Sequence, residues 1–384
     1  MHSSMLVNLL VLTASRASAL PATCSRSDHH NANRHCRDLT IDINISAENQ
    51  VFTLKPPHGD IEVTNFVLNV IQPGSNFTQT ISSGTSTKSG SYQIAATYCE
   101  PSHGPGKALQ ILTHGINFGK SYWDHPVHNY NYSYVNSALS RNYSVFFYDR
   151  LGVGGSSKGD PLNEIQPALE LSALQALTSM LRQTSVPGIE TKYEKLVHVG
   201  HSFGSLLTYA FTDSFPTLSN GIALTGFSLD PEFSALSILG DNIVAANSLP
   251  EWKHLPDGYL VDKGVNSLHT GFFSPDAFDP EVLEAAYKVV EPRTIGETLS
   301  QDVVPMQSQF GGPVLVITGE RDFPACGGNC LATEPSIPAM TEEAFVKASS
   351  FNVTIVPGTG HALNFHYSWP TTYGVVSDFF DEIV

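Results

Sequence analysis

The sequence has little positive charge and few charged residues of either sign. Lys and Arg together number 20 against 36 Asp and Glu, which gives a formal net charge of −16, and charged residues occupy only 15% of the 384 positions. A surface of this sign repels phosphate groups, so we expect neither nucleic acid nor a membrane as a partner. The hydrophobic content of 41% indicates a globular protein with a large core.

Metal-binding motifs and long apolar runs are also missing. The fifteen histidines form no H-E-x-x-H motif, and there is no C-x-x-C pair, so we expect neither a metal nor a cofactor. Met5–Leu12 is a short apolar run followed by Ala17-Ser18-Ala19, the pattern of a signal peptide cleaved after residue 19. No later stretch is long enough to span a bilayer. We therefore expect a secreted protein.

The sequons and cysteines agree with secretion. Asn-x-Ser/Thr triplets predict N-glycans at some of Asn44, Asn76, Asn131, Asn142 and Asn352. Cys24 and Cys36 bracket a loop near the mature N-terminus, and Cys326 and Cys330 bracket a flexible Gly-Gly-Asn. We expect one disulfide in each pair and a free, buried Cys99 in a strand.

The order of predicted elements indicates an α/β fold with a mostly parallel central sheet flanked by helices. After the leader, residues 20–107 are expected to form an N-terminal arm and antiparallel opening strands, at 38–45, 66–71 and 92–98. Apolar strands are predicted at 109–113, 143–148, 196–199, 222–225, 313–318 and 353–356. Helices are predicted at 134–140, 162–180, from 203 to about 215, and 372–384. The core thus comprises residues 108–230 and 309–384.

Residues 231–308 interrupt this alternation and are interpreted as an inserted helical cap over the strand ends. Its apolar side chains are expected to form a roof, from Phe233, Leu236, Ile238, Trp252, Leu255, Tyr259, Phe272 and Phe273. A plain extra helical layer is the alternative. In parallel sheets ligands bind beyond the C-terminal strand ends, which is where this cap would lie.

Gly200-His201-Ser202-Phe203-Gly204 fits the G-x-S-x-G pattern between a predicted strand and helix. The two glycines let the backbone pass close to the turn, so that the Ser202 hydroxyl stands clear of the sheet as a nucleophile. The N–H of Phe203 lies at the helix start, where it can stabilise an oxyanion. His201 is a candidate for substrate binding.

A serine nucleophile needs a histidine base and an acid that orients it. His361 follows the last strand in Gly-Thr-Gly-His and is the predicted base, with His366 as the competitor. Asp322 follows the preceding strand and is the predicted acid, with Asp230 as the rival. Beside Asp322, Glu320 and Arg321 are expected to pair with each other.

The run His114-Gly115-Ile116-Asn117 follows another predicted strand end. The N–H of Ile116 is the predicted second oxyanion donor, although the Asn117 side chain is an alternative source. Asn117 and the cap residue Trp252 are also candidates for substrate binding.

Together these motifs resemble the α/β-hydrolase superfamily. The resemblance rests on four separated segments, which are His114-Gly115, Asp149-Arg150-x-Gly152-x-Gly154-x-Ser156, the Ser202 turn, and the pair Asp322 and His361. It implies the α/β-hydrolase fold and a structural role for the Asp149 segment. The Cys-bearing N-terminal arm resembles extracellular fungal esterases and lactonases.

The superfamily hosts many reactions, so the nucleophile must discriminate among them. Relatives that open epoxides or displace halides use an aspartate in place of Ser202, which disfavours both activities; those that activate oxygen or add cyanide share the serine triad. We expect a secreted, cofactor-independent serine hydrolase that cleaves an ester or lactone of a small apolar molecule through an acyl-enzyme. The alternatives are an amide, peptide or thioester hydrolase with the same triad, and a non-catalytic binding module.

Overall fold

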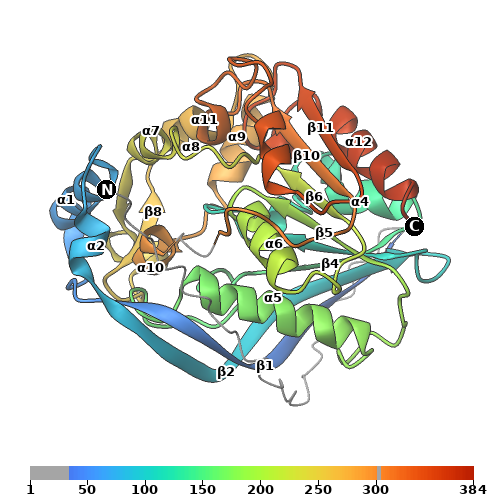
Figure 1. The fold of residues 1–384 in the computed structure, drawn as a ribbon, viewed down its shortest axis with the longest axis horizontal. Helices are drawn as coiled ribbons and strands as arrows, with labels where there is room; N and C mark the ends of the chain where they lie inside the picture. Colours follow the sequence, from blue (N-terminus) through green and yellow to red (C-terminus); the bar gives the residue numbers. More distant parts are fainter. Residues whose placement is uncertain (1–33, 301–303) are drawn as a thin grey trace, which may run out of the picture.

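An eight-stranded sheet runs through the centre of the protein in the computed structural model, which describes residues 34–300 and 304–384 (Figure 1). Its strand order is β1-β2-β4-β3-β5-β6-β10-β11. Strand β2 runs antiparallel to both β1 and β4, and all the other neighbouring pairs are parallel. The strands are β1 Arg34–Phe52, β2 Ser82–Pro101, β3 Leu109–Thr113, β4 Ser144–Tyr148, β5 Leu196–His201, β6 Ile222–Thr225, β10 Val314–Gly319 and β11 Phe351–Val356. The predicted α/β-hydrolase fold is therefore confirmed.

Helices cover both faces of this sheet, and those that pack on it bury apolar side chains against its strands. The helices outside the β6–β10 connection are α1 Gly59–Ile71, α2 Phe77–Ile81, α3 Val127–Tyr130, α4 Tyr134–Ser140, α5 Pro167–Arg182, α6 Phe203–Ser214, α11 Phe323–Cys326 and α12 Trp369–Asp381. Helix α5 packs with α6 on one face, and α4 with α12 on the other (Figure 1). Within the described ranges, no helix combines the length and apolar character needed to cross a bilayer.

The connection from β6 to β10 forms a cap that is only partly helical. It contains helices α7 Ser234–Gly240, α8 Val265–Phe272, α9 Pro280–Tyr287 and α10 Ile295–Leu299. It also contains strands β7 Ile243–Ala245, β8 Tyr259–Asp262 and β9 Arg293–Thr294. These three short strands pair into an antiparallel sheet that the helical prediction missed, because strands of two to four residues are too short to show a period.

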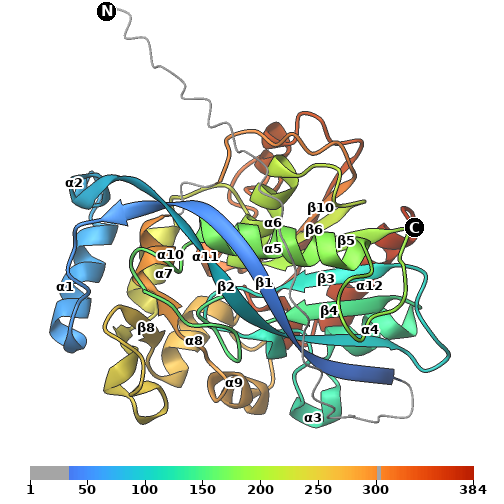
Figure 2. The same ribbon diagram turned by 90° about the horizontal axis from the view of Figure 1, so that it is seen from below.

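The segment 66–71, predicted as a strand, lies in helix α1. Val63 and Phe66 are buried, and Val67 and Val70 pack beside them on the cap. Their spacing of three, four and seven residues places all four side chains on one helical face. Helix α1 contacts β7 and α7, so this segment from the N-terminal part of the chain adds a helix to the cap (Figure 2).

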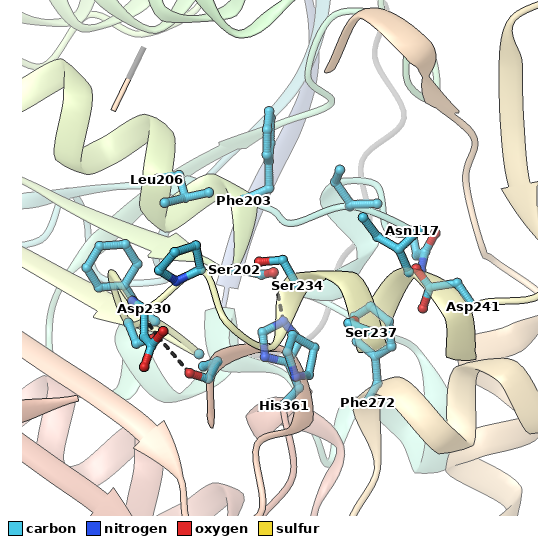
Figure 3. A pocket seen from close by; sticks show the side chains of 18 of the residues that line it. Asn117, Ser202, Phe203, Leu206, Asp230, Ser234, Ser237, Asp241, Phe272 and His361 are labelled. Carbon is cyan, nitrogen blue, oxygen red and sulfur yellow. Dashed lines mark hydrogen bonds between the residues drawn. The ribbon is translucent and has the colours of Figure 1, made fainter. Parts of the chain in front are cut away.

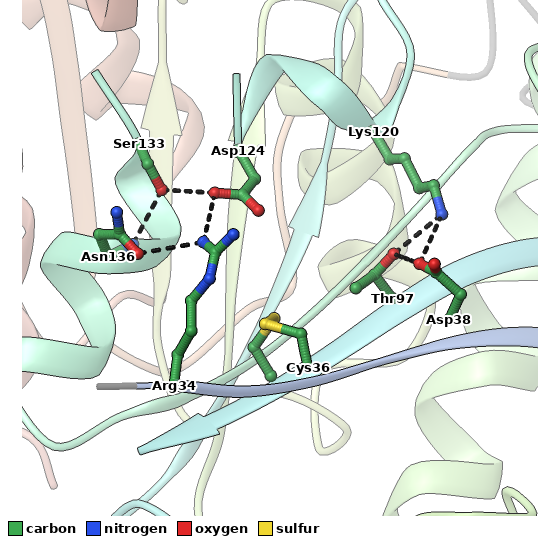
Figure 4. The surroundings of a disulfide bond; sticks show 9 residues. Arg34, Cys36, Asp38, Thr97, Lys120, Asp124, Ser133 and Asn136 are labelled. Carbon is green, nitrogen blue, oxygen red and sulfur yellow. Dashed lines mark hydrogen bonds and ion pairs between the residues drawn. A yellow bond between two sulfur atoms is a disulfide. The ribbon is translucent and has the colours of Figure 1, made fainter. Parts of the chain in front are cut away.

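The predicted cysteine pairing needs a correction at the N-terminal end. Cys36 is bonded to Cys99, not to Cys24, so Cys99 is not free. The long antiparallel pair β1–β2 sets these two cysteines directly opposite each other, which strand register determines and sequence proximity does not (Figure 4). Cys24 lies outside the described residues, as does the predicted signal peptide. The predicted Cys326–Cys330 disulfide is present.

Candidate active site

Ser202 occupies a strained turn between β5 and α6. Its backbone angles of φ 53° and ψ −120° lie in a region that residues other than glycine rarely adopt. The turn is possible because the residues two positions before and after Ser202 are glycines, and the backbone packs too closely around both for any side chain. A Cβ on Gly200 would lie 2.5 Å from the carbonyl oxygen of Gly204, and one on Gly204 would lie 2.1 Å from that of Thr113. This turn thus places the Ser202 side chain at the C-terminal end of strand β5.

The structure brings Ser202, His361 and Asp322 into one hydrogen-bonded chain. His361 Nε2 lies 2.7 Å from Ser202 Oγ, and His361 Nδ1 lies 2.8 Å from Asp322 Oδ2. Asp322 and His361 are 0% and 2% exposed, so water does not compete for the bond between them. This arrangement allows the imidazole to take a proton from the hydroxyl while the carboxylate fixes its tautomer.

Asp322 is held by the helix that it caps. Its Oδ1 accepts a hydrogen bond from the N–H of Ala325 at 2.8 Å, as the N-cap of α11, which leaves Oδ2 for His361. The rival acid Asp230 lines the same cavity, but its carboxylate accepts from the N–H of Glu232 instead. The expected pair of Glu320 and Arg321 forms at 3.7 Å.

His366, the competing base, connects the cap to the loop that carries His361. Its Nδ1 donates to the carbonyl oxygen of Ala362 at 2.8 Å. Its Nε2 accepts from the N–H of Ser274 at 2.9 Å and from that of Gly360 at 3.1 Å. Burial lowers the pKa of His366 to about 4, which agrees with a neutral ring whose Nε2 must accept. Its role is therefore to position the loop.

The two residues that carry the predicted oxyanion donors lie near the nucleophile. Phe203 begins α6, and both Phe203 and Ile116 line the cavity into which Ser202 opens. A Cβ on Gly115 would lie 2.9 Å from Ser202 Cβ, so the loop before Ile116 passes against the nucleophile. The Asn117 side chain is less suited to this role because its Nδ2 donates to Asp262.

His114 and Arg150 support this arrangement from within the core. The His114 ring donates from Nδ1 to the carbonyl oxygen of Gly115 at 2.8 Å and accepts at Nε2 from the N–H of Arg150 at 3.0 Å. Burial lowers the pKa of His114 well below its usual value, so the ring stays neutral. The Arg150 guanidinium lies 4.6 Å from the Phe203 ring centre and pairs with Glu170 and Glu297.

A cavity of about 370 Å³ opens above Ser202, between the sheet and the cap (Figure 3). Apolar side chains form much of its wall, including Leu206, Phe227, Leu229, Ile238 and Phe272. A volume of this size lies within the range of pockets that enclose small organic ligands. Ser202 and His361 stand at its floor, so a reacting carbonyl bound there would meet the nucleophile directly.

Two predicted substrate-binding residues lie elsewhere. His201 ends β5 and is completely buried, stacked 4.2 Å from the Tyr122 ring and hydrogen-bonded to Thr225. Burial lowers its pKa well below the usual value. Trp252 packs against the main hydrophobic core. Of the expected apolar roof, Ile238 and Phe272 belong to the described cavity wall, whereas Leu236 is exposed and Tyr259 is buried in the core.

Polar residues, most of which the sequence did not single out, form one end of the cavity. This polar end consists of the lining residues Asn117, Asp241 and Arg293, with Asp262 hydrogen-bonded behind them, and each is at most 6% exposed. Arg293 donates to Asp241 at 2.8 Å and also to Asp262. Asn117 was predicted to bind substrate, but the other three are scattered through the cap with no motif to mark them. In the described ranges, no cluster of three or more His, Cys, Asp or Glu is arranged to hold a metal ion.

Comparisons with known proteins agree on the fold. Residues 110–368 match the model of a family described as the alpha/beta hydrolase family. A search of curated proteins found no match.

Similar solved structures include a thermophilic esterase from Thermogutta terrifontis, with 14% sequence identity and a TM-score of 0.53, covering 77% of this chain and 95% of that one. Another is an enol-lactonase from Burkholderia xenovorans, with 17% identity and a TM-score of 0.51, covering 75% of this chain and 97% of that one. At these identities the likeness concerns the fold.

Proposed function

Because the chain belongs to the alpha/beta hydrolase family, we propose that it is a secreted serine hydrolase that cleaves a small carboxylic ester or lactone. The observation that carries this proposal is the chain of contacts from Ser202 through His361 to Asp322, at 2.7 and 2.8 Å, on the floor of a cavity. A non-catalytic binding module does not need a serine, a histidine and an aspartate hydrogen-bonded in this order. The similarity to the structures of an esterase and an enol-lactonase supports the same choice.

The reaction follows from the positions of these groups. Ser202 Oγ attacks the ester carbonyl as its proton passes to His361 Nε2, and the N–H groups of Phe203 and Ile116 hold the oxyanion. His361 then gives the proton to the leaving alcohol, which leaves an acyl group on Ser202. Water attacks this acyl-enzyme with His361 as base, which releases the acid and restores the hydroxyl. Asp322 keeps the His361 ring oriented throughout.

The size of the cavity favours a small ester over a peptide. A space of about 370 Å³ between the sheet and the cap matches a small ester better than a chain that continues on both sides of the scissile bond. Amides and thioesters of small acids would fit the same space, so the bond that is cleaved must be measured. A panel of ester, amide and thioester substrates with one common acyl group measures it, and we expect kcat/KM to be highest for the ester.

Secretion is part of the same proposal. The predicted leader over residues 1–19 is supported by two disulfides, Cys36–Cys99 and Cys326–Cys330, which persist in oxidising compartments. Four of the five sequons, those at Asn76, Asn131, Asn142 and Asn352, present exposed asparagines. Expression in a eukaryotic secretory host, followed by N-terminal sequencing and treatment with an N-glycosidase, tests the leader and the glycans together.

Paired substitutions of the two candidate acids test the triad. We expect Asp322→Asn to lower kcat for an aryl ester by roughly 10⁴-fold, because an amide at this position holds the wrong tautomer of His361. The control is Asp230→Asn, which replaces the rival carboxylate in the same cavity and is expected to change kcat far less. Equal losses in the two variants would remove Asp322 from the proposed mechanism.

A further inference from the structure

The polar end of the cavity retains hydrogen-bonding capacity that the protein itself does not use. Both oxygens of Asp262 are occupied, Oδ1 by Arg293 and Oδ2 by Asn117. In contrast, Asp241 Oδ1, Asn117 Oδ1 and Arg293 Nε have no partner in the described part of the chain, although each atom is buried. A buried polar group without a hydrogen-bond partner destabilises the folded protein. Three such groups at one end of a binding cavity point to a ligand that forms hydrogen bonds there.

The position of these groups places that ligand next to the reaction centre. Asn117, Asp241 and Arg293 all line the cavity, and Asn117 directly follows the proposed oxyanion donor Ile116. Figure 3 shows Asn117 and Asp241 at one end of the cavity and Asp230 at the other, with Ser202 between them. A substrate whose carbonyl lies at Ser202 can therefore extend toward the polar end.

The charges and free atoms define what this end can bind. Two aspartates face a single arginine, so a substrate carboxylate would meet two carboxylates with only one guanidinium between them. The buried atoms without a partner are two acceptors and one donor. A hydroxyl group matches both kinds, because it donates one hydrogen bond and accepts another.

We propose that the polar end is a specificity site for a hydroxyl group that the substrate carries away from its scissile carbonyl. The hydroxyl donates to Asp241 Oδ1 and accepts from Arg293 Nε, while Asp262, behind them, orients Arg293 and Asn117. The substrate class is accordingly a hydroxylated ester or lactone, with its apolar part against the remaining wall. This inference rests on the proposed ester hydrolysis.

The test compares matched substrates on the wild-type protein. Aryl esters of straight-chain acids of increasing length are prepared with a terminal hydroxyl, methoxy, amino or carboxylate group, and acetate esters of alcohols with the same end groups form a second series. In at least one series, at the chain length that brings the end group to the polar end, we expect kcat/KM for the hydroxyl compound to exceed that of the methoxy compound by at least about tenfold. The reason is that the methoxy compound cannot donate the hydrogen bond to the charged Asp241. Equal rates at every length, or a preference for the amine or the carboxylate, would overturn the proposal.

A matched pair of variants locates the effect. Asp241→Asn replaces an acceptor at the polar end and is expected to reduce the hydroxyl-to-methoxy ratio of kcat/KM at least fivefold. Asp230→Asn, at the other end of the cavity, is expected to leave that ratio as it is. If both variants keep the wild-type ratio, the hydroxyl does not bind at Asp241 and the proposal fails. If Asp241→Asn does not fold, the wild-type substrate series decides alone.

Failure of this inference and failure of the proposed function have different signatures. A wild-type protein that takes a fluorophosphonate label at Ser202 but shows no hydroxyl preference refutes the specificity site alone. A wild-type protein that neither takes the label nor hydrolyses any ester refutes the proposed function, and this inference with it.

Discussion

Replacing His366 with Gln tests whether this buried ring connects the cap to the His361 loop. The neutral ring accepts hydrogen bonds from the N–H groups of Ser274 and Gly360, and protonation of Nε2 removes both. Burial lowers the pKa of His366 to about 4 in the folded protein, whereas an unfolded chain has a value near 6.5. Between these two pH values the unfolded state takes up a proton that the folded state does not.

The sign and size of the effect follow from this difference. Stability from the neutral ring is fully present above about pH 6.5 and is lost as the pH falls to about 4, for a total of roughly 3 kcal/mol. Gln at this position keeps an acceptor for the two N–H groups but loses the bond to Ala362, which costs about 1 kcal/mol. The variant should therefore be less stable than wild type by about 1 kcal/mol at pH 7.5, and more stable by about 2 kcal/mol at pH 4.

Urea unfolding followed by tryptophan fluorescence at several pH values measures this crossing. His254→Gln is the control, because His254 lies exposed at the surface and should show no crossing. A free-energy difference between wild type and His366→Gln that stays constant from pH 7.5 to pH 4 would refute the assignment of a buried, neutral ring.

Two further predictions concern the backbone around the site and the N-terminal strands. Gly204→Ala should abolish ester hydrolysis and lower the melting temperature, because its Cβ would lie 2.1 Å from a carbonyl oxygen of β3. The control is Gly374→Ala in a helix, where a Cβ has open space around it, and this variant should keep its activity and keep or raise the melting temperature. Equal behaviour of the two variants would contradict the packing of α6 on β3. Removing the Cys36–Cys99 disulfide, which spans 63 residues, should lower the free energy of unfolding by roughly 4 kcal/mol. This is about twice the effect expected for Cys326–Cys330, which spans 4 residues. Denaturant unfolding of the two double Cys→Ser variants measures both losses, and a larger loss for Cys326–Cys330 would contradict the prediction.

Local sequence patterns predicted the core of the fold because its strands and turns are determined by neighbouring residues. The strand at Leu109–Thr113 and the helix at Tyr134–Ser140 have the predicted bounds. The predicted site residues Ser202, Asp322 and His361 are also brought together, since each follows a strand whose C-terminal end reaches the same edge of the sheet. Here the order of elements is enough to predict which side chains meet.

The features that were missed depend on contacts between distant segments. Cys99 pairs with Cys36 through the register of two long strands, which no local spacing reveals. Asp241 and Arg293 lie 52 positions apart and meet only because the cap folds as it does. The helical spacing in α1 was present in the sequence and was obscured by the apolar residues of 66–71, which only Asn69 interrupts.

Intact-mass and peptide-level mass spectrometry of the protein after reaction with a fluorophosphonate tests the central claim most directly. We predict one covalent adduct per chain, located at Ser202 and absent from Ser202→Ala. An adduct on another residue, or a Ser202→Ala variant that still carries the label and hydrolyses an aryl ester, would contradict the account.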